Sequence, residues 1–252
     1  MVFLIVLISI VLLMCVGLFL VWRFNKMESF VVILKKIWGG IKVFWSEVVA
    51  YPWYVLTHPV RGFSDMKTEK KGKMWVAVVI LLLFVLEEIV AYKYTGIGST
   101  NKINDQTKFS SINILIFTVL PVILITVSNW SVTTLMNGKG KMKEIFIMIC
   151  YSLMPFITLS FIKVLISNFV TADEAQFITL LNIVAIALLV FMGFMGFVVT
   201  HEYGIFKTIG SIILTAVALC IILFIALLIF DLSQQVYGFV YSLYKEIATR
   251  LV

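Results

Sequence analysis

Long apolar runs set the strongest limit on what this chain can fold into. Five runs are long enough to cross a membrane, at residues 74–94, 112–136, 145–167, 177–199 and 205–230. A hydrocarbon core about 30 Å thick takes about 20 residues of helix. Only 13% of the residues are charged, and 62% are hydrophobic, whereas soluble domains carry about 25% charged residues. We therefore expect an all-α polytopic membrane helix bundle with five core spans.

A sixth apolar run, at residues 2–22, precedes the five core spans. No basic residue stands before it and no small-residue cleavage site follows it. It therefore reads as a retained anchor rather than a cleaved signal. Four regions result: an anchor at 1–22, an interfacial segment at 23–73, a membrane domain at 74–230 and an amphipathic helix at 231–252.

The positions of the basic residues predict the orientation of the spans. Ten lysines and arginines lie at residues 23–73, whereas residues 168–176 carry two acids and no base. Because basic loops stay in the cytoplasm, the segment 23–73 is expected there and the C-terminus on the external side of the membrane. Lys102 and Lys108 oppose this assignment, since their loop is expected outside.

The net charge of +7 lies mostly beside the spans. This favours anionic lipid as a partner, at about 1 kcal/mol per base near the membrane, over nucleic acid, for which no recognition motif is present. The three cysteines lie in separate spans without a CxxC pattern: Cys15, Cys150 and Cys220. We expect no metal, disulfide or cofactor.

The segment before the first core span has a helical apolar pattern. Its apolar residues recur every three or four positions: Phe30, Leu34, Ile37, Ile41, Phe44 and Val48. This pattern is typical of a helix lying in the membrane interface, with Trp38, Phe44, Trp45 and Trp53 at headgroup depth. Packing on the cytoplasmic face of the bundle is an equal and compatible alternative. Pro52 and Pro59 are expected to break the chain.

The C-terminal tail carries a second apolar stripe. Its members follow helical spacing: Val236, Val240, Leu243, Ile247 and Leu251. We expect an amphipathic helix on the external face, which either lies on the outer leaflet or contacts a partner.

Charged residues inside spans are costly and are functional candidates. Glu87 and Glu88 lie in the first core span and Lys163 in the third, at similar depth toward the outside. One hypothesis is an ion pair that joins the two helices. The alternative is that Lys163 extends its ammonium to the surface, with a glutamate protonated or hydrated.

Polar residues also gather where the second core span meets the third. Asn129, Thr133 and Thr134 have helical spacing and are expected to hydrogen-bond across helices. Trp130 is expected at the interface, and the following NGKGK reverses the chain. On the next span Tyr151 is a further polar candidate, and Pro155 is expected to bend the helix or to free a carbonyl for a neighbour.

The sequence contains no pattern for enzymatic chemistry. Adjacent glutamates on a helix point about 100° apart and cannot flank one bond. NGKGK lacks the spacing of a phosphate-binding loop, and no HExxH or GxGD is present. His201, at the end of the fourth span, reads as a satisfied interface residue rather than a catalyst. We expect no enzyme activity.

Several of these motifs together resemble the Yip1 domain family. The resemblance rests on these motifs and residues: NW-x-x-TTLM, the turn NGKGKMKEI, YSLMPF on the next span, YVLTHPVRGFSDMK before the first span, and Gly193, Gly196 and His201 near the fourth span. The tail YSLYKEIATRL is similar to that of Gram-positive members. The resemblance covers about residues 51–252, and the N-terminal anchor departs from it.

This resemblance implies five membrane helices, a cytoplasmic N-terminal region and no established catalytic site. Eukaryotic members act in vesicle traffic and bind Rab-type GTPases, whereas bacterial members resemble accessories of ABC transport systems. We therefore expect a protein that binds other integral membrane proteins, namely ABC transporter subunits, through segment 23–73 and the corner at 129–143. Alternatives are a solute or ion permease lined by Glu87, Glu88, Asn129 and Lys163, and a membrane-shaping protein.

Overall fold

The fold is all-α in the part of the chain that the structure describes. This computed structural model describes residues 38–39, 42, 45–96, 110–171 and 174–250, and within them it contains helices and no strands. The chain divides into two units, Met1–Tyr51 and Pro52–Val252. The predicted anchor at residues 2–22 and Phe44 lie outside the described residues.

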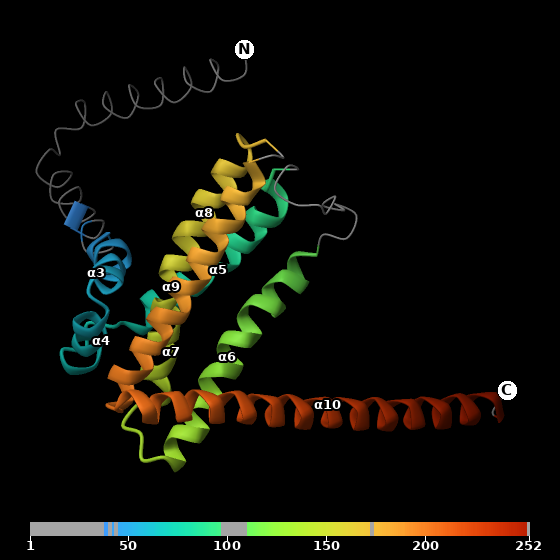
Figure 1. Ribbon diagram of the computed structural model, residues 1–252. Coiled ribbons are helices and arrows are strands. Elements are labelled where there is room, and N and C mark those ends of the chain that lie inside the picture. Colours follow the sequence, from blue (N-terminus) through green and yellow to red (C-terminus); the bar gives the residue numbers. More distant parts are fainter. Residues whose placement is uncertain (1–37, 40–41, 43–44, 97–109, 172–173, 251–252) are drawn as a thin grey trace, which may run out of the picture. The chain divides into compact units, whose positions relative to one another are not determined.

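Among its described residues, the second unit has five helical segments long and apolar enough to cross a membrane, which confirms the predicted count of core spans. Figure 1 shows their arrangement. In chain order they are α5 (Met74–Tyr94), α6 (Ser111–Leu135), the pair α7 (Met142–Ser152) and α8 (Met154–Ser167), α9 (Ala175–His201) and α10 (Ile205–Arg250). The first four begin and end within three residues of the predicted spans. Hydropathy alone was therefore sufficient to place them.

The third span is interrupted at Leu153, between α7 and α8. Pro155 stands in the first turn of α8. A proline ring clashes with the carbonyl four residues earlier and supplies no N–H, so the α-helix ends just before it. The structure thus interrupts the third span two residues before Pro155.

Two short helices precede α5. The π-helical turn η1 (Ser46–Ala50) is followed directly by α3 (Tyr51–Thr57), so the prediction of a break at Pro52 is wrong. Pro52 lies where the π-helical turn changes to the α-helix, and the chain stays helical through it. The break comes at His58, and Pro59 opens α4 (Pro59–Thr68), as predicted.

Helix α4 packs on the membrane domain. Phe63 is 1% exposed, and its ring lies 3.4 Å from the position of a Cβ built on Gly196 of α9. Lys67 adds a hydrogen bond to the Thr200 carbonyl at 2.8 Å. For this part of the segment, packing on the bundle is therefore the alternative that the structure supports.

Helix α10 differs most from the prediction, because it is one uninterrupted helix of 46 residues. The tail expected as a separate helix at 231–252 continues the fifth span as far as Arg250. At 1.5 Å per residue the helix is about 69 Å long, more than twice the hydrocarbon core. Thr208, Ser211 and Thr215 are buried near its start, whereas residues 223–247 are all exposed.

Candidate functional site

A buried polar corner joins the ends of α6 and α9 to the start of α10. We call it the α6–α9 corner, and it consists of Asn129, Gly138, Gly140, His201, Tyr203 and Thr215. Asn129 is 0% exposed and His201 is 1% exposed. Because buried polar groups are costly without partners, their hydrogen bonds determine what the corner can do.

The hydrogen bonds of the corner form a chain with one direction. Thr215 Oγ1 donates to the Ser211 carbonyl at 2.7 Å and therefore accepts from Asn129 Nδ2 at 3.1 Å. The Asn129 Oδ1 atom then faces His201 Nε2 at 2.8 Å. An amide oxygen can only accept, so the proton of the neutral imidazole is on Nε2. The Nδ1 atom of His201 is left as an acceptor.

The two glycines of the NGKGK turn pack against this histidine. A Cβ built on Gly138 would lie 2.6 Å from Tyr203 Oη and 3.0 Å from His201 Nδ1. A Cβ on Gly140 would lie 2.8 Å from the Cε1 atom of the same ring. No described group hydrogen-bonds to Nδ1. The glycines therefore allow a close approach of the turn to α9.

Helices α6 and α9 end in the same way. Asn137 and Glu202, which follow them, both have a φ of 56°. The N–H of Gly138 reaches back to the Thr133 carbonyl at 2.7 Å, and that of Tyr203 to the Val198 carbonyl at 3.1 Å. This is the pattern of a Schellman helix end, whose left-handed residue is usually glycine and sometimes asparagine. A glutamate there is unusual.

The Glu202 side chain connects three parts of the corner's rim. It accepts from Lys139 Nζ at 2.6 Å and from Lys67 Nζ at 2.9 Å. These hydrogen bonds, the one from Lys139 first, lower the pKa of the Glu202 carboxyl to about 2. Burial raises the pKa of the neighbouring Tyr203 hydroxyl, which donates to the Met136 carbonyl at 3.3 Å.

Not every polar residue predicted here joins two helices. Thr133 and Thr134 donate within α6, to the carbonyls of Asn129 at 2.7 Å and Trp130 at 2.6 Å. Their predicted bonds across helices are therefore wrong, because a threonine in an apolar helix satisfies its hydroxyl locally. Trp130 and Thr134 are exposed. Tyr151 and Pro155 are buried in the third span.

The sequence analysis missed four residues of this region: Lys67, Glu202, Tyr203 and Thr215. A usable signal was present in HEYG at 201–204, where three polar side chains precede a glycine between two spans. Polar residues at the shared end of neighbouring spans are candidates to bond with each other. Asn129 and His201 were both singled out, and the structure brings them together.

A second polar region lies nearer the other end of the bundle. We call it the α5–α8 cluster, and it consists of Glu87, Glu88, Ser160, Lys163 and Asn182. Lys163 Nζ donates to Asn182 Oδ1 of α9 at 3.0 Å. Among the described residues, neither Glu87 nor Glu88 forms an ion pair with Lys163 within 4.0 Å, although both glutamates interact with its charge over a longer distance. The structure thus gives Lys163 a different partner from the predicted one.

Glu87 of this cluster is buried, with 1% of its surface exposed. Ser160 of α8 lies beside its carboxyl group, yet no described group hydrogen-bonds to the Oε2 atom. Glu88 faces elsewhere and is half-buried. The cluster therefore contains a carboxyl group whose hydrogen-bonding capacity is not filled, in contrast to the amide of Asn129.

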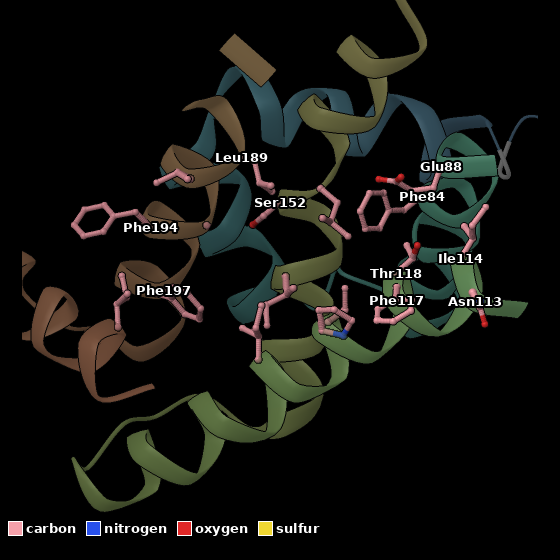
Figure 2. Close-up of a pocket in the computed structure, with 18 of the residues that line it drawn as sticks. Phe84, Glu88, Asn113, Ile114, Phe117, Thr118, Ser152, Leu189, Phe194 and Phe197 are labelled. Atoms are coloured by element: carbon pink, nitrogen blue, oxygen red, sulfur yellow. The ribbon is translucent and has the colours of Figure 1, made fainter. Parts of the chain in front are cut away.

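A groove of about 710 Å³ runs between α6 and α9. Figure 2 shows Phe84 and Glu88 beside Thr118 of α6, with Phe194 and Phe197 of α9 across the groove. The lining is mostly apolar. Of the four residues expected to line a permeation path, Glu88 alone lines this groove, so these four do not share it.

Metal-ligand side chains are dispersed in the part of the chain that the structure describes. No group of three or more histidines, cysteines or acids there is placed to hold a metal ion. Cys150 is buried and Cys220 is exposed, and both are free thiols.

The described residues include five helical segments long and apolar enough to cross a membrane, and three of these segments meet at a buried polar corner. They define a multi-pass integral membrane protein. Its sequence matches the Yip1 domain over residues 53–228. The chain belongs to the Yip1 domain family, as its motifs indicated. The match ends within α10, so the tail beyond residue 228 lies outside it. No curated protein and no solved structure matches the chain.

Proposed function

We propose that this protein is non-enzymatic and binds other integral membrane proteins, as an accessory or regulatory subunit of an ABC transport system in a bacterial plasma membrane. Membership of the Yip1 family supports a binding role, and the link to ABC systems rests on the resemblance to bacterial members. The corner residues Asn129 and His201 bind each other and are buried, which suits a structural joint. The proposed mechanism requires no cofactor.

The observation that carries this proposal is the apolar stripe on the second half of α10. Val236, Val240, Leu243 and Ile247 are separated by four, three and four residues, and all are exposed. The helix here is past the apolar run that ends at residue 230. Alternating steps of three and four are typical of a helix that packs along another helix. We therefore assign this stripe to a partner helix.

We also propose that the α6–α9 corner faces the cytoplasm and that the C-terminus is outside. Lys67, Lys139 and Lys207 surround the corner, and basic residues favour the cytoplasmic side. At the opposite end of the bundle, Asn168 Nδ2 donates to the Tyr94 carbonyl at 2.9 Å, which joins the ends of α5 and α8. A C-terminal epitope should react with a membrane-impermeant reagent on intact cells.

The direct test is copurification from native membranes in mild detergent. Val240→Asp with Ile247→Asp places two charges on the stripe and should remove most of the partner, including ABC subunits. The matched control, Gln234→Asp with Ser242→Asp, adds the same charges to the opposite face and should keep it. Retention of the same partners by both variants would reject the stripe.

A second contact surface is proposed on segment 23–73. Trp38, Trp45 and Trp53 are 72%, 63% and 54% exposed, as an interfacial or partner contact requires. Phe44→Asp with Trp45→Asp should weaken copurification if this surface binds protein. If the variant copurifies with the same proteins as the wild type, these side chains contact lipid and not a protein partner.

A permease is the second candidate, because Glu88 lines the 710 Å³ groove. Flux through proteoliposomes that contain this chain alone separates the two functions. An accessory subunit should conduct nothing, whereas solute or ion flux that falls in Glu88→Gln would favour the permease. Deformation of the same liposomes would instead favour the membrane-shaping alternative.

A further inference from the structure

A second cavity, of about 460 Å³, lies where α4 and the link to α5 meet the start of α7. Its charged lining consists of five lysines and one glutamate: Lys67, Lys70, Lys73, Lys141, Lys143 and Glu144. The remaining wall is largely apolar and includes Phe63, Met66, Ile147 and Met148. A concave site of this volume is in the range that accommodates small molecules.

The positive charges of this pocket are only partly neutralised by the protein. Lys67 pairs with Glu202 at 2.9 Å, and the Glu144 carboxylate accepts from the Lys141 N–H at 3.1 Å as a helix cap. No described carboxylate lies within 4.0 Å of the ammonium groups of Lys70, Lys141 or Lys143. All three residues are exposed, so water screens their mutual repulsion, and an anion in the pocket would neutralise their charge.

Lys70 follows the end of α4. Its φ is 53°, the left-handed conformation that also follows α6 at Asn137 and α9 at Glu202 and that commonly ends a helix. Glycine adopts this conformation without the cost that lysine bears.

The position of the pocket along the spans indicates what kind of anion fits. Helix α5 begins at Met74 and α7 begins at Met142, so the lysines lie where membrane spans start. Trp75 is 41% exposed at the same level, as expected for an interfacial aromatic residue. The lysines are therefore at headgroup depth, and the apolar wall continues toward the hydrocarbon.

We propose that this pocket binds the phosphate of an anionic membrane lipid, with Lys70, Lys141 and Lys143 as its cationic contacts. Basic pockets between membrane helices are known to hold such headgroups. A soluble phosphate compound shares the anionic chemistry, but it would leave the apolar side chains that remain accessible in the lining uncovered, namely half-buried Met66 and Met74, which is 40% exposed. The site is distinct from the α10 stripe, so it does not depend on the partner proposed there.

The test is calorimetric titration of the purified full chain with three probes. Dihexanoyl-phosphatidylglycerol should bind saturably, whereas dihexanoyl-phosphatidylcholine and inorganic phosphate should bind at least roughly tenfold more weakly. Lys70→Gln with Lys143→Gln should weaken phosphatidylglycerol binding by roughly tenfold or more. The control Arg61→Gln with Lys207→Gln removes equal charge at the same end of the bundle, outside the pocket, and should change it less than about twofold.

Two further variants separate binding from folding. Lys70→Gly removes a charge while relieving the backbone, so it should weaken lipid binding without lowering the melting temperature. Glu144→Gln keeps the cap but removes the negative charge and should strengthen binding. Unchanged binding in the pocket variant, or an equal loss in the control, would overturn the proposal. If inorganic phosphate binds as tightly as phosphatidylglycerol, the pocket binds a soluble ligand and the proposal of a lipid ligand is overturned.

Discussion

The α6–α9 corner and the α5–α8 cluster place similar numbers of polar side chains in an apolar bundle, yet they are bonded differently. In the corner, each bond from His201 to Asn129 to Thr215 fixes the donor and acceptor of the next. In the cluster, Lys163 bonds to Asn182, while Glu87 keeps an unbonded buried oxygen. Burial alone therefore does not define a joint between helices.

The difference indicates which region holds the helices together. The corner also contains an unbonded buried atom, His201 Nδ1, but its Asn129 amide is bonded to two other helices and so fixes their geometry. A buried oxygen without a partner, as in Glu87, costs stability. The corner therefore behaves as a joint, and the cluster as a local cost that a substitution can relieve. The following four predictions compare the regions in order of expected effect on stability.

Asn129→Ala should have the largest effect. It leaves the buried His201 Nε2–H without its acceptor, and an unsatisfied buried donor costs about 1–3 kcal/mol. We expect a loss of about 2 kcal/mol, measured by thermal unfolding of the purified protein in detergent. Thr134→Ala removes a bond on an exposed face of the same helix and should change stability little. Equal losses in both variants would contradict the special role of Asn129.

Gly138→Ala should have the next largest effect, because the added methyl group would lie 2.6 Å from Tyr203 Oη. Overpacking of this kind costs about 1–3 kcal/mol, and we expect a value in the lower half of that range. Gly204→Ala is the control, since a Cβ there has no neighbour within 4 Å. A corner that tolerates alanine at position 138 would not be closely packed.

Glu87→Gln should have a smaller effect of the opposite sign. It replaces a buried carboxyl that has an unbonded oxygen with a neutral amide of the same shape, which lowers the cost of burial. We expect unchanged or slightly higher stability, by about 1 kcal/mol at most. Glu88→Gln, at a half-buried position, should change it less. A clear loss in Glu87→Gln would show that the cluster is also a joint.

Glu202→Gln should have the smallest effect at neutral pH, because Glu202 is exposed and water screens its ion pairs. Its folded pKa, about 2, is below the ordinary value of 4.5. The carboxylate thus stabilises the folded state above pH 4.5, and this contribution is lost as the pH falls toward 2. The difference in melting temperature between wild type and variant should shrink over that interval. A constant difference in melting temperature would show that ionisation of the Glu202 carboxyl does not contribute to the stability of the fold.

The spans could be predicted because hydropathy is a local property. Helix α5 has the predicted bounds, 74–94, and the break near Pro155 also follows from one residue type. The end of the fifth span could not be predicted in this way. Asp231 and the following SQQ suggest that the apolar span stops, but such residues remain compatible with helix, and α10 continues to Arg250.

The bonds between helices could be predicted only in part. Asn129 was expected to join helices, but its partners His201 and Thr215 lie 72 and 86 residues later. Nothing in a single sequence pairs residues over such distances. Charge complementarity favoured a glutamate for Lys163, whereas packing placed the amide of Asn182 within reach. Opposite charge therefore predicts proximity better than it predicts a direct bond.

A double-mutant cycle of Asn129→Ala and His201→Phe tests the central claim most directly, namely that the polar residues of the corner fasten helices together. The phenylalanine keeps a ring in place while removing the donor. The account predicts a coupling energy of about 1 kcal/mol between the two sites in thermal unfolding. Losses that add to within about 0.3 kcal/mol would contradict it.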